Sequence, residues 1–131
     1  MKKQVEDWIA LAGKDLHAAE IIIKDDSSLA NIAAFHCQQA IEKYLKAFII
    51  EKGIPLIKTH DLIRLNGMIN EVEHLGIDEK KLIVLNEVYI DSRYPGDLGL
   101  MPDGIPTEEQ TGEFIEYVKE VKTIVMKHIN N

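Results

Sequence analysis

The sequence predicts an all-α protein, an up-and-down bundle of about five helices in a single domain that covers residues 1–131. Apolar residues recur at spacings of three and four in five separate segments, which is the period of one face of an α-helix. Turn-forming residues separate the segments, and no segment shows the alternation typical of a strand. Of the 131 residues, 46% are hydrophobic and 28% are charged, a balance typical of a folded protein with a buried core.

The first two predicted helices occupy the N-terminal part of the chain. One covers residues 3–23, with a single apolar face made of Val5, Trp8, Ile9, Ala12, Leu16, Ala19 and Ile23. The segment "KDDSS" at 24–28 then interrupts this period. Ser28 is suited to cap the second helix, which continues to Lys52 and is ended by Gly53.

The third and fourth helices are shorter. Thr59 is suited to cap the third, which ends near Gly76 and whose apolar face is Leu62, Leu65, Ile69 and Val72. The fourth covers residues 78–90, with Leu82, Leu85 and Tyr89 on one side.

A loop and a last helix complete the prediction. The segment "DSRYPGDLGLMPDGIPT" at 91–107 is rich in Pro and Gly and is expected to be a loop. Thr107 and Gln110 form a capping box for a helix that ends near His128, with Phe114, Val118, Val121 and Val125 on its apolar face.

Charge and composition restrict the kind of partner and the compartment. The net charge of -7 argues against a broad basic surface for nucleic acid, although a local basic groove remains open. No apolar run approaches the ~20 residues of a membrane span, and Glu6 and Asp7 interrupt any signal-peptide pattern. Cys37 is the single cysteine, so no internal disulfide can form. We therefore expect a cytoplasmic protein without a membrane partner, in which Cys37 is a small core residue.

The second predicted helix carries a polar stripe within an otherwise apolar stretch, "AFHCQQAIEKYLKAF". At ~100° per residue, the side chains of the stripe fall in one narrow sector of the helix, and they are His36, Gln39, Lys43 and Lys46. One interpretation is a solvated face. The other is a cationic strip that meets an anion or a partner helix, because ammonium groups held together repel each other unless an anion is present.

The same region carries a family resemblance. "FHCQQAIEKYLKAFIIEKG", followed by "KTHDLIRL" and "SRYPGD", resembles the HEPN family over about residues 5–128. The matching positions are Gln39, Ala40, Glu42, Lys43, Leu45, Lys46, Ala47, Thr59, His60, Arg93, Tyr94 and Pro95. The resemblance implies a helical bundle similar to the helical domain of the aminoglycoside nucleotidyltransferases. It also implies that the protein is a homodimer and that its gene lies beside the gene of a minimal nucleotidyltransferase. In some members of the family the two proteins form a toxin–antitoxin pair.

The resemblance further implies a nucleotide ligand, bound by His36, Gln39, Lys43, Lys46, His60, Arg93 and Tyr94. The two lysines would supply charge for phosphate, Arg93 a bidentate contact, His60 a hydrogen bond and Tyr94 a stacking surface. Each residue also has a structural interpretation: Arg93 and His60 suit contacts to the backbone at helix ends, and Tyr94 suits a plug at the end of the bundle.

An enzyme is not the preferred interpretation. Ribonucleases of the family carry an Arg, four to six residues and then a His; no histidine lies in that position after Arg64 or Arg93. The sequence also lacks the common nucleotide-binding and hydrolase motifs and any recognisable metal-ligand spacing, so no cofactor or metal is expected. Two alternatives remain: a ribonuclease toxin built on Arg93, His60 and Lys43, with RNA as a less favoured partner, and a purely structural assembly module.

Overall fold

The computed structural model describes residues 2–91 and 106–130. Within these ranges the chain forms five α-helices and one short 3-10 turn, and no strand is found in them, so the all-α prediction is confirmed. The elements are α1 (Lys3–Asp25), η1 (Ser27–Leu29), α2 (Ala30–Glu51), α3 (Leu62–Asn70), α4 (Glu79–Asp91) and α5 (Glu108–Ile129). No helix of the described part is long and apolar enough to cross a membrane.

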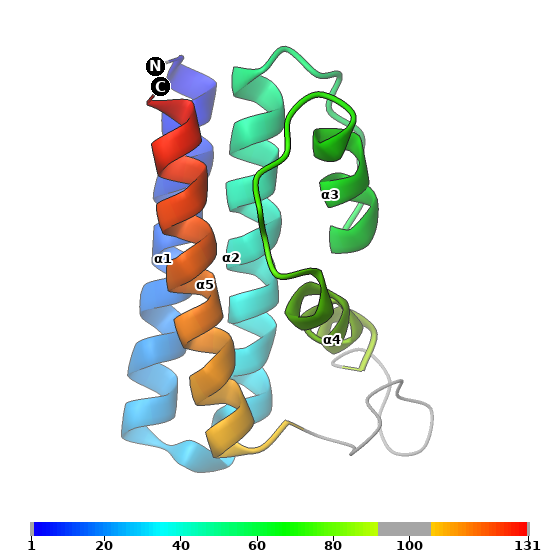
Figure 1. Ribbon diagram of the computed structural model, residues 1–131. Helices are drawn as coiled ribbons and strands as arrows, with labels where there is room; N and C mark the ends of the chain where they lie inside the picture. The colour runs from blue at the N-terminus through cyan, green and yellow to red at the C-terminus, as the bar shows by residue number, and fades with distance from the viewer. Residues whose placement is uncertain (1, 92–105, 131) are drawn as a thin grey trace.

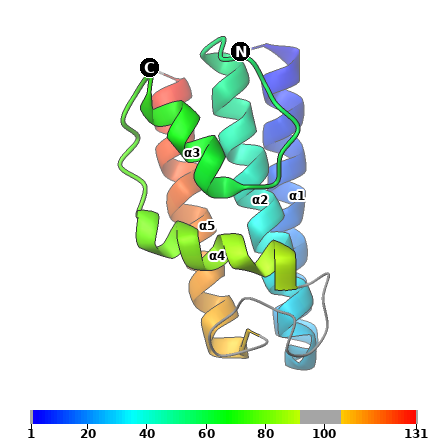
Figure 2. The same cartoon turned by 90° about the vertical axis from the view of Figure 1, so that its right-hand side faces the viewer.

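Three long helices form the body of the molecule. Helices α1, α2 and α5 lie side by side, with α1 running opposite to α2 and α5 (Figure 1). The shorter helices α3 and α4 pack on the other side of α2, and α4 runs across the bundle rather than along it (Figure 2). Helix α2 therefore contacts every other helix of the described chain and is the centre of the fold.

The central position of α2 explains its composition. Neighbours surround it, so apolar residues are buried on several of its sides, among them Ala33, Cys37, Ile41, Tyr44, Leu45, Phe48 and Ile49. Helices α1 and α5 bury one face each, as their patterns predict. The single chain covers most of the apolar side chains of α2, whereas Ile32 near its start is 43% exposed.

The start of α3 differs from the prediction. The helix begins at Leu62, and its cap is Asp61, whose Oδ1 accepts hydrogen bonds from Ile63 N at 3.0 Å and Arg64 N at 3.3 Å. Thr59 lies before the cap, and its hydroxyl accepts a bond from Asp61 N at 3.1 Å. Both residue types are good caps, so local rules do not choose between them.

The end of α3 differs as well. The helix ends at Asn70, before the predicted boundary, and Val72 is 58% exposed instead of lying in the core. Gly76 has a φ of 79°, the left-handed conformation that glycine adopts without strain, in the connection to α4.

The other boundaries follow local capping chemistry. Ser28 does not cap α2; instead the Asp26 carboxylate accepts from Ser28 N at 3.0 Å and opens the 3-10 turn that precedes α2. The predicted stop at Gly53 is confirmed by its positive φ of 72°. Thr107 caps α5 as predicted, with its hydroxyl accepting from Gln110 N at 3.1 Å. Most of the predicted loop, residues 92–105, lies outside the described residues.

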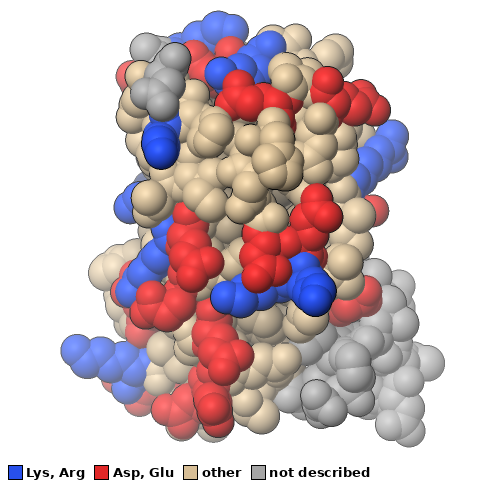
Figure 3. All heavy atoms as spheres, viewed as in Figure 1, with Lys and Arg blue, Asp and Glu red and all other residues tan. Residues whose placement is uncertain are grey.

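The face seen in Figure 3 shows how charge is distributed over the bundle. Acidic and basic side chains are interspersed on this face, so the basic ones form no continuous area there. This agrees with the net charge of -7.

Candidate functional site

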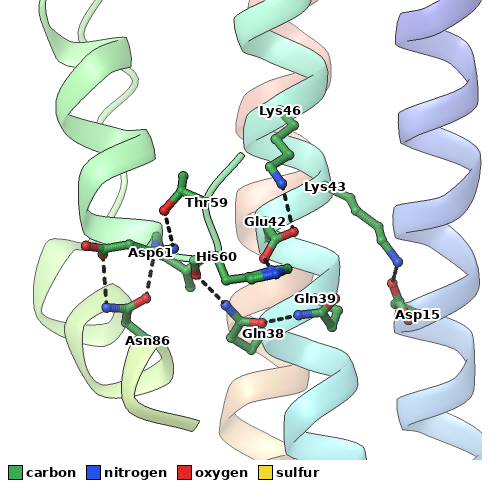
Figure 4. Close-up of polar contacts among 11 residues, drawn as sticks. Asp15, Gln38, Gln39, Glu42, Lys43, Lys46, Thr59, His60, Asp61 and Asn86 are labelled. Atoms are coloured by element: carbon green, nitrogen blue, oxygen red, sulfur yellow. Dashed lines mark hydrogen bonds and ion pairs between the residues drawn. The ribbon is translucent and has the colours of Figure 1, made fainter. Parts of the chain in front are cut away.

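The polar stripe of α2 lies between α1 on one side and the segment that links α2 to α3 on the other (Figure 4). Lys43 reaches toward α1, whereas Glu42 and Gln38 point toward the link that carries His60. The stripe is therefore not a solvated helix face. It is a set of polar contacts between α2 and two other parts of the chain.

Asp15 of α1 neutralises one half of the stripe. Its Oδ1 lies 2.9 Å from Nδ1 of His36, and its Oδ2 forms an ion pair with the Lys43 ammonium. The Asp15 side chain is 12% exposed, that of Lys43 21% and that of His36 31%. The cluster ties α1 to α2 while leaving part of the Lys43 side chain accessible. Lysine has three N–H donors, and the pair with Asp15 does not use all of them.

Glu42 neutralises the other half. Its side chain is 4% exposed; Oε2 lies 3.0 Å from the Lys46 ammonium and Oε1 lies 2.8 Å from Nδ1 of His60. The Lys46 side chain is 9% exposed, and its ammonium lies 5.5 Å from the centroid of the Trp8 ring. A buried carboxylate needs such partners because an unpaired charge is costly outside water.

These pairs correct one step of the sequence argument. Lys43 and Lys46 do not form an unrelieved group of like charges, because each has its own carboxylate. Lys46 is nearly buried and anchors Glu42, so it presents little surface to a ligand. Mutual repulsion of the lysines therefore gives no reason to expect an anion here.

His60 is accessible and is held by contacts on several sides. Glu42 holds its Nδ1, and the buried amide of Gln38 donates from Nε2 to the His60 backbone carbonyl at 3.0 Å. The imidazole stacks on the ring of Tyr89 from α4, with centroids 4.3 Å apart and planes inclined by 19°. Its side chain is still 49% exposed. A carboxylate at Nδ1 fixes the orientation of an imidazole and leaves Nε2 to face a ligand or solvent.

Sequence reasoning missed two residues that build this arrangement. Glu42 and Gln38 lie on α2 but outside the predicted polar stripe, and no structural role was predicted for them. The available signal was their type: a carboxylate and an amide among core residues must find partners. Gln39, which was predicted, donates from its Nε2 to Gln38 Oε1 at 2.6 Å and so extends the network.

Arg93 and Tyr94 lie outside the described residues, so the ligand-binding roles predicted for them stay predictions. Cys37 is a core residue, as expected. Its burial, together with the nearby carboxylates of Glu20 and Asp15, raises the pKa of the thiol to about 12, which keeps it protonated and unreactive. Among the described residues no group of three or more His, Cys, Asp or Glu side chains is arranged to hold a metal ion.

Comparison with known proteins gives the family. A family model described as the HEPN domain matches residues 5–129. The chain belongs to the HEPN family. Its fold is similar to the crystal structure of ST0689, an archaeal HEPN homologue: the two are 26% identical, the match covers 98% of this chain and 99% of that one, and the TM-score is 0.74.

A second solved structure, that of TT1696 from Thermus thermophilus, has the same fold. It is 18% identical, the match covers 96% of this chain and 98% of that one, and the TM-score is 0.73. No curated protein matched the chain. The matched HEPN residues include both ends of the polar network, from Asp15 on α1 to Tyr89 on α4.

Proposed function

We propose that this HEPN domain binds a nucleotide on the face of α2 beside the link to α3, as the non-catalytic partner of a separate minimal nucleotidyltransferase in a toxin–antitoxin pair. The observation that carries the binding site is the imidazole of His60, which is fixed by a buried carboxylate and still half exposed. Family membership supports the partner, because the resemblance of the sequence is to the nucleotidyltransferase-associated branch.

Each accessible group of the site has a role that its chemistry allows. His60 would hydrogen-bond the ligand through Nε2, and Lys43 would offer a remaining ammonium donor to a phosphate while keeping its pair with Asp15. Gln39 and His36 would complete the polar rim. Lys46 would act indirectly, by holding Glu42 in place. Arg93 and Tyr94 retain the bidentate and stacking roles that the family resemblance implies.

We also propose that the domain is a homodimer. Most apolar residues of α2 are buried within the single chain, but three large apolar side chains are exposed: Leu11 is 45% exposed, Ile21 52% and Ile32 43%. They lie on α1 and at the start of α2, where a second subunit could cover them. Sedimentation at micromolar concentration should give a dimer that Ile32→Glu weakens. A strict monomer would contradict the proposal.

One observation favours a different function. Because Lys43 and Lys46 both have carboxylate partners, the stripe is self-sufficient as an internal contact. This supports the structural assembly module, in which no small ligand binds.

Thermal melts separate the two functions. We would measure wild type and three variants, His60→Gln, Lys43→Gln and His17→Gln, with the four ribonucleoside triphosphates, their monophosphates and inorganic triphosphate. His17 is an exposed histidine of α1 and serves as the matched control. A nucleotide at ~100 times its dissociation constant should stabilise the wild type and His17→Gln by about 2.7 kcal/mol. The shift should be much smaller in His60→Gln and Lys43→Gln.

Two outcomes would reject the nucleotide site. One is no shift with any nucleotide, which leaves the assembly module. The other is an equal shift in His60→Gln and wild type, which places the ligand elsewhere. A shift with inorganic triphosphate alone would show that phosphate, and not the base, is recognised.

A further inference from the structure

A cavity of about 300 Å³ lies between the first turns of α4 and the first turns of α5. Helix α4 packs closely on α2 and α3 but makes little backbone contact with α5, and Figure 2 shows it crossing the direction of α5. Crossing helices separate on either side of their contact, so space remains that side chains fill only in part. The volume is at the lower end of the range for small-molecule sites.

The floor of the cavity is apolar and firmly held. Phe114 and Tyr117 of α5 are 6% and 2% exposed. The hydroxyl of Tyr117 donates to the backbone carbonyl of Asp78 at 2.8 Å, which fixes the ring against the start of α4. The carboxylate of Asp78 in turn accepts from Lys81 N at 3.1 Å and caps α4. The cavity is therefore formed by residues that the fold itself orients.

Two lysines contribute to the rim of the cavity. Lys80 and Lys81 line it from α4, and in the described part of the chain neither ammonium lies within ion-pair distance of a carboxylate. The Lys81 ammonium lies 6.0 Å from the centroid of the Tyr117 ring. Glu113 is the single carboxylate among the lining residues, and Gln110 adds an amide. Two ammonium groups thus face one carboxylate among the lining residues. The carboxylates of Asp78, Glu79 and Glu120 also lie near enough to Tyr117 to add to the effect of burial in raising the pKa of its hydroxyl.

We propose that this cavity binds a small organic anion with a flat apolar body, of the aromatic carboxylate type. The ring would lie on Phe114, Tyr117 and the methyl groups of Val84, where apolar surface is removed from water. The carboxylate would lie between the ammonium groups of Lys80 and Lys81, which have no anionic partner among the described residues. An organic cation would gain no contact with the two ammonium groups, and an inorganic anion would leave the apolar floor unused.

This site is independent of the nucleotide site on α2. Its lining residues come only from α4 and α5, and none belongs to the network of His60 and Lys43. Failure of one proposal therefore leaves the other untouched. A Lys43→Gln variant should bind the aromatic anion as the wild type does.

The test is a titration of the isotope-labelled protein with salicylate, followed by NMR, with salicylamide as the neutral probe of the same shape. Salicylate should saturate at low-millimolar concentration and shift the amides of residues 80–84 and 110–117. Lys81→Gln should weaken binding about tenfold, as for the loss of one charge-assisted contact. Val84→Trp should fill the cavity and abolish binding. Lys122→Gln, an exposed lysine further along α5, should change nothing.

Three results would overturn the proposal. The first is no saturable shift with salicylate. The second is equal affinity for salicylamide, which would make the cavity apolar without selectivity for an anion. The third is an equal loss of affinity in Lys81→Gln and Lys122→Gln, which would show that net charge and not the rim is responsible. Lys80→Gln provides the same comparison if Lys81→Gln does not fold.

Discussion

Replacing Glu42 by Leu tests whether the buried polar network is a matched set of charges. The change removes the carboxylate that lies 3.0 Å from the Lys46 ammonium, and the Lys46 side chain is only 9% exposed. The remaining partner of that ammonium is the Trp8 ring at 5.5 Å, a contact worth about 0.5–2 kcal/mol. Breaking a buried pair on one side typically costs about 3–5 kcal/mol.

We therefore expect Glu42→Leu to lower the free energy of unfolding by about 3–5 kcal/mol and the melting temperature by on the order of 10–15 °C. Lys46→Met should cost less, because Glu42 keeps the hydrogen bond from His60. The double variant Glu42→Leu/Lys46→Met should recover most of the loss, since two apolar side chains of similar size remove both buried charges at once. His60 is half exposed, so water can replace its bond to Glu42.

Urea denaturation of the four proteins gives the coupling energy of the pair by a double-mutant cycle. The control is Asp7→Ala, which removes a pair at the same i, i+4 spacing, Lys3 with Asp7, whose side chains are 82% and 56% exposed. It should leave stability unchanged within error. The reasoning is refuted if Glu42→Leu costs less than about 1 kcal/mol, or if the two single effects simply add in the double variant.

Individual contacts give three further predictions. Asp61→Ala should cost about 1–2 kcal/mol in urea denaturation and Thr59→Ala clearly less, because Asp61 caps α3; the reverse order would restore Thr59 as the cap. Cys37 should not react with a disulfide reagent at pH 8 until denaturant is added, because the pKa of its thiol is raised to about 12; rapid labelling of the folded protein would contradict this. The hydrogen bond from His128 lowers the pKa of Glu73 below 4.5, so this contact stabilises the fold above pH 4.5 and is lost as the pH falls below it. The melting temperatures of wild type and Glu73→Gln should converge on acidification through this range, and a constant difference would count against the contact.

The sequence by itself determined the helices and the family. A period of 3.6 residues is a local property of the backbone, so the apolar faces of α1 and α5 could be read from spacing alone. The phase of the polar stripe was equally local: His36 and Lys43 do share one partner, Asp15 of α1, whereas Lys46 is nearly buried and pairs with Glu42. The motif shared with HEPN proteins pointed to the family that the comparison then established.

Tertiary structure decided which polar groups meet. Asp15 pairs with Lys43 across 28 positions of the chain, and no local rule relates two residues on different helices. The cap of α3 was decided in the same way: Asn86 of α4 donates from Nδ2 to Asp61 Oδ1 at 3.2 Å and accepts from Leu62 N at 2.8 Å, which favours Asp61 over Thr59.

The packing around α2 explains why its polar residues were hardest to interpret. A helix that is buried on several sides has no single solvent face, so its pattern does not show which polar side chains are buried. Gln38 and Glu42 could be recognised as structural only once the link to α3 had brought His60 against them. Spacing along a helix assigns a residue to a face, whereas the direction in which the neighbouring helices cross decides what that face touches.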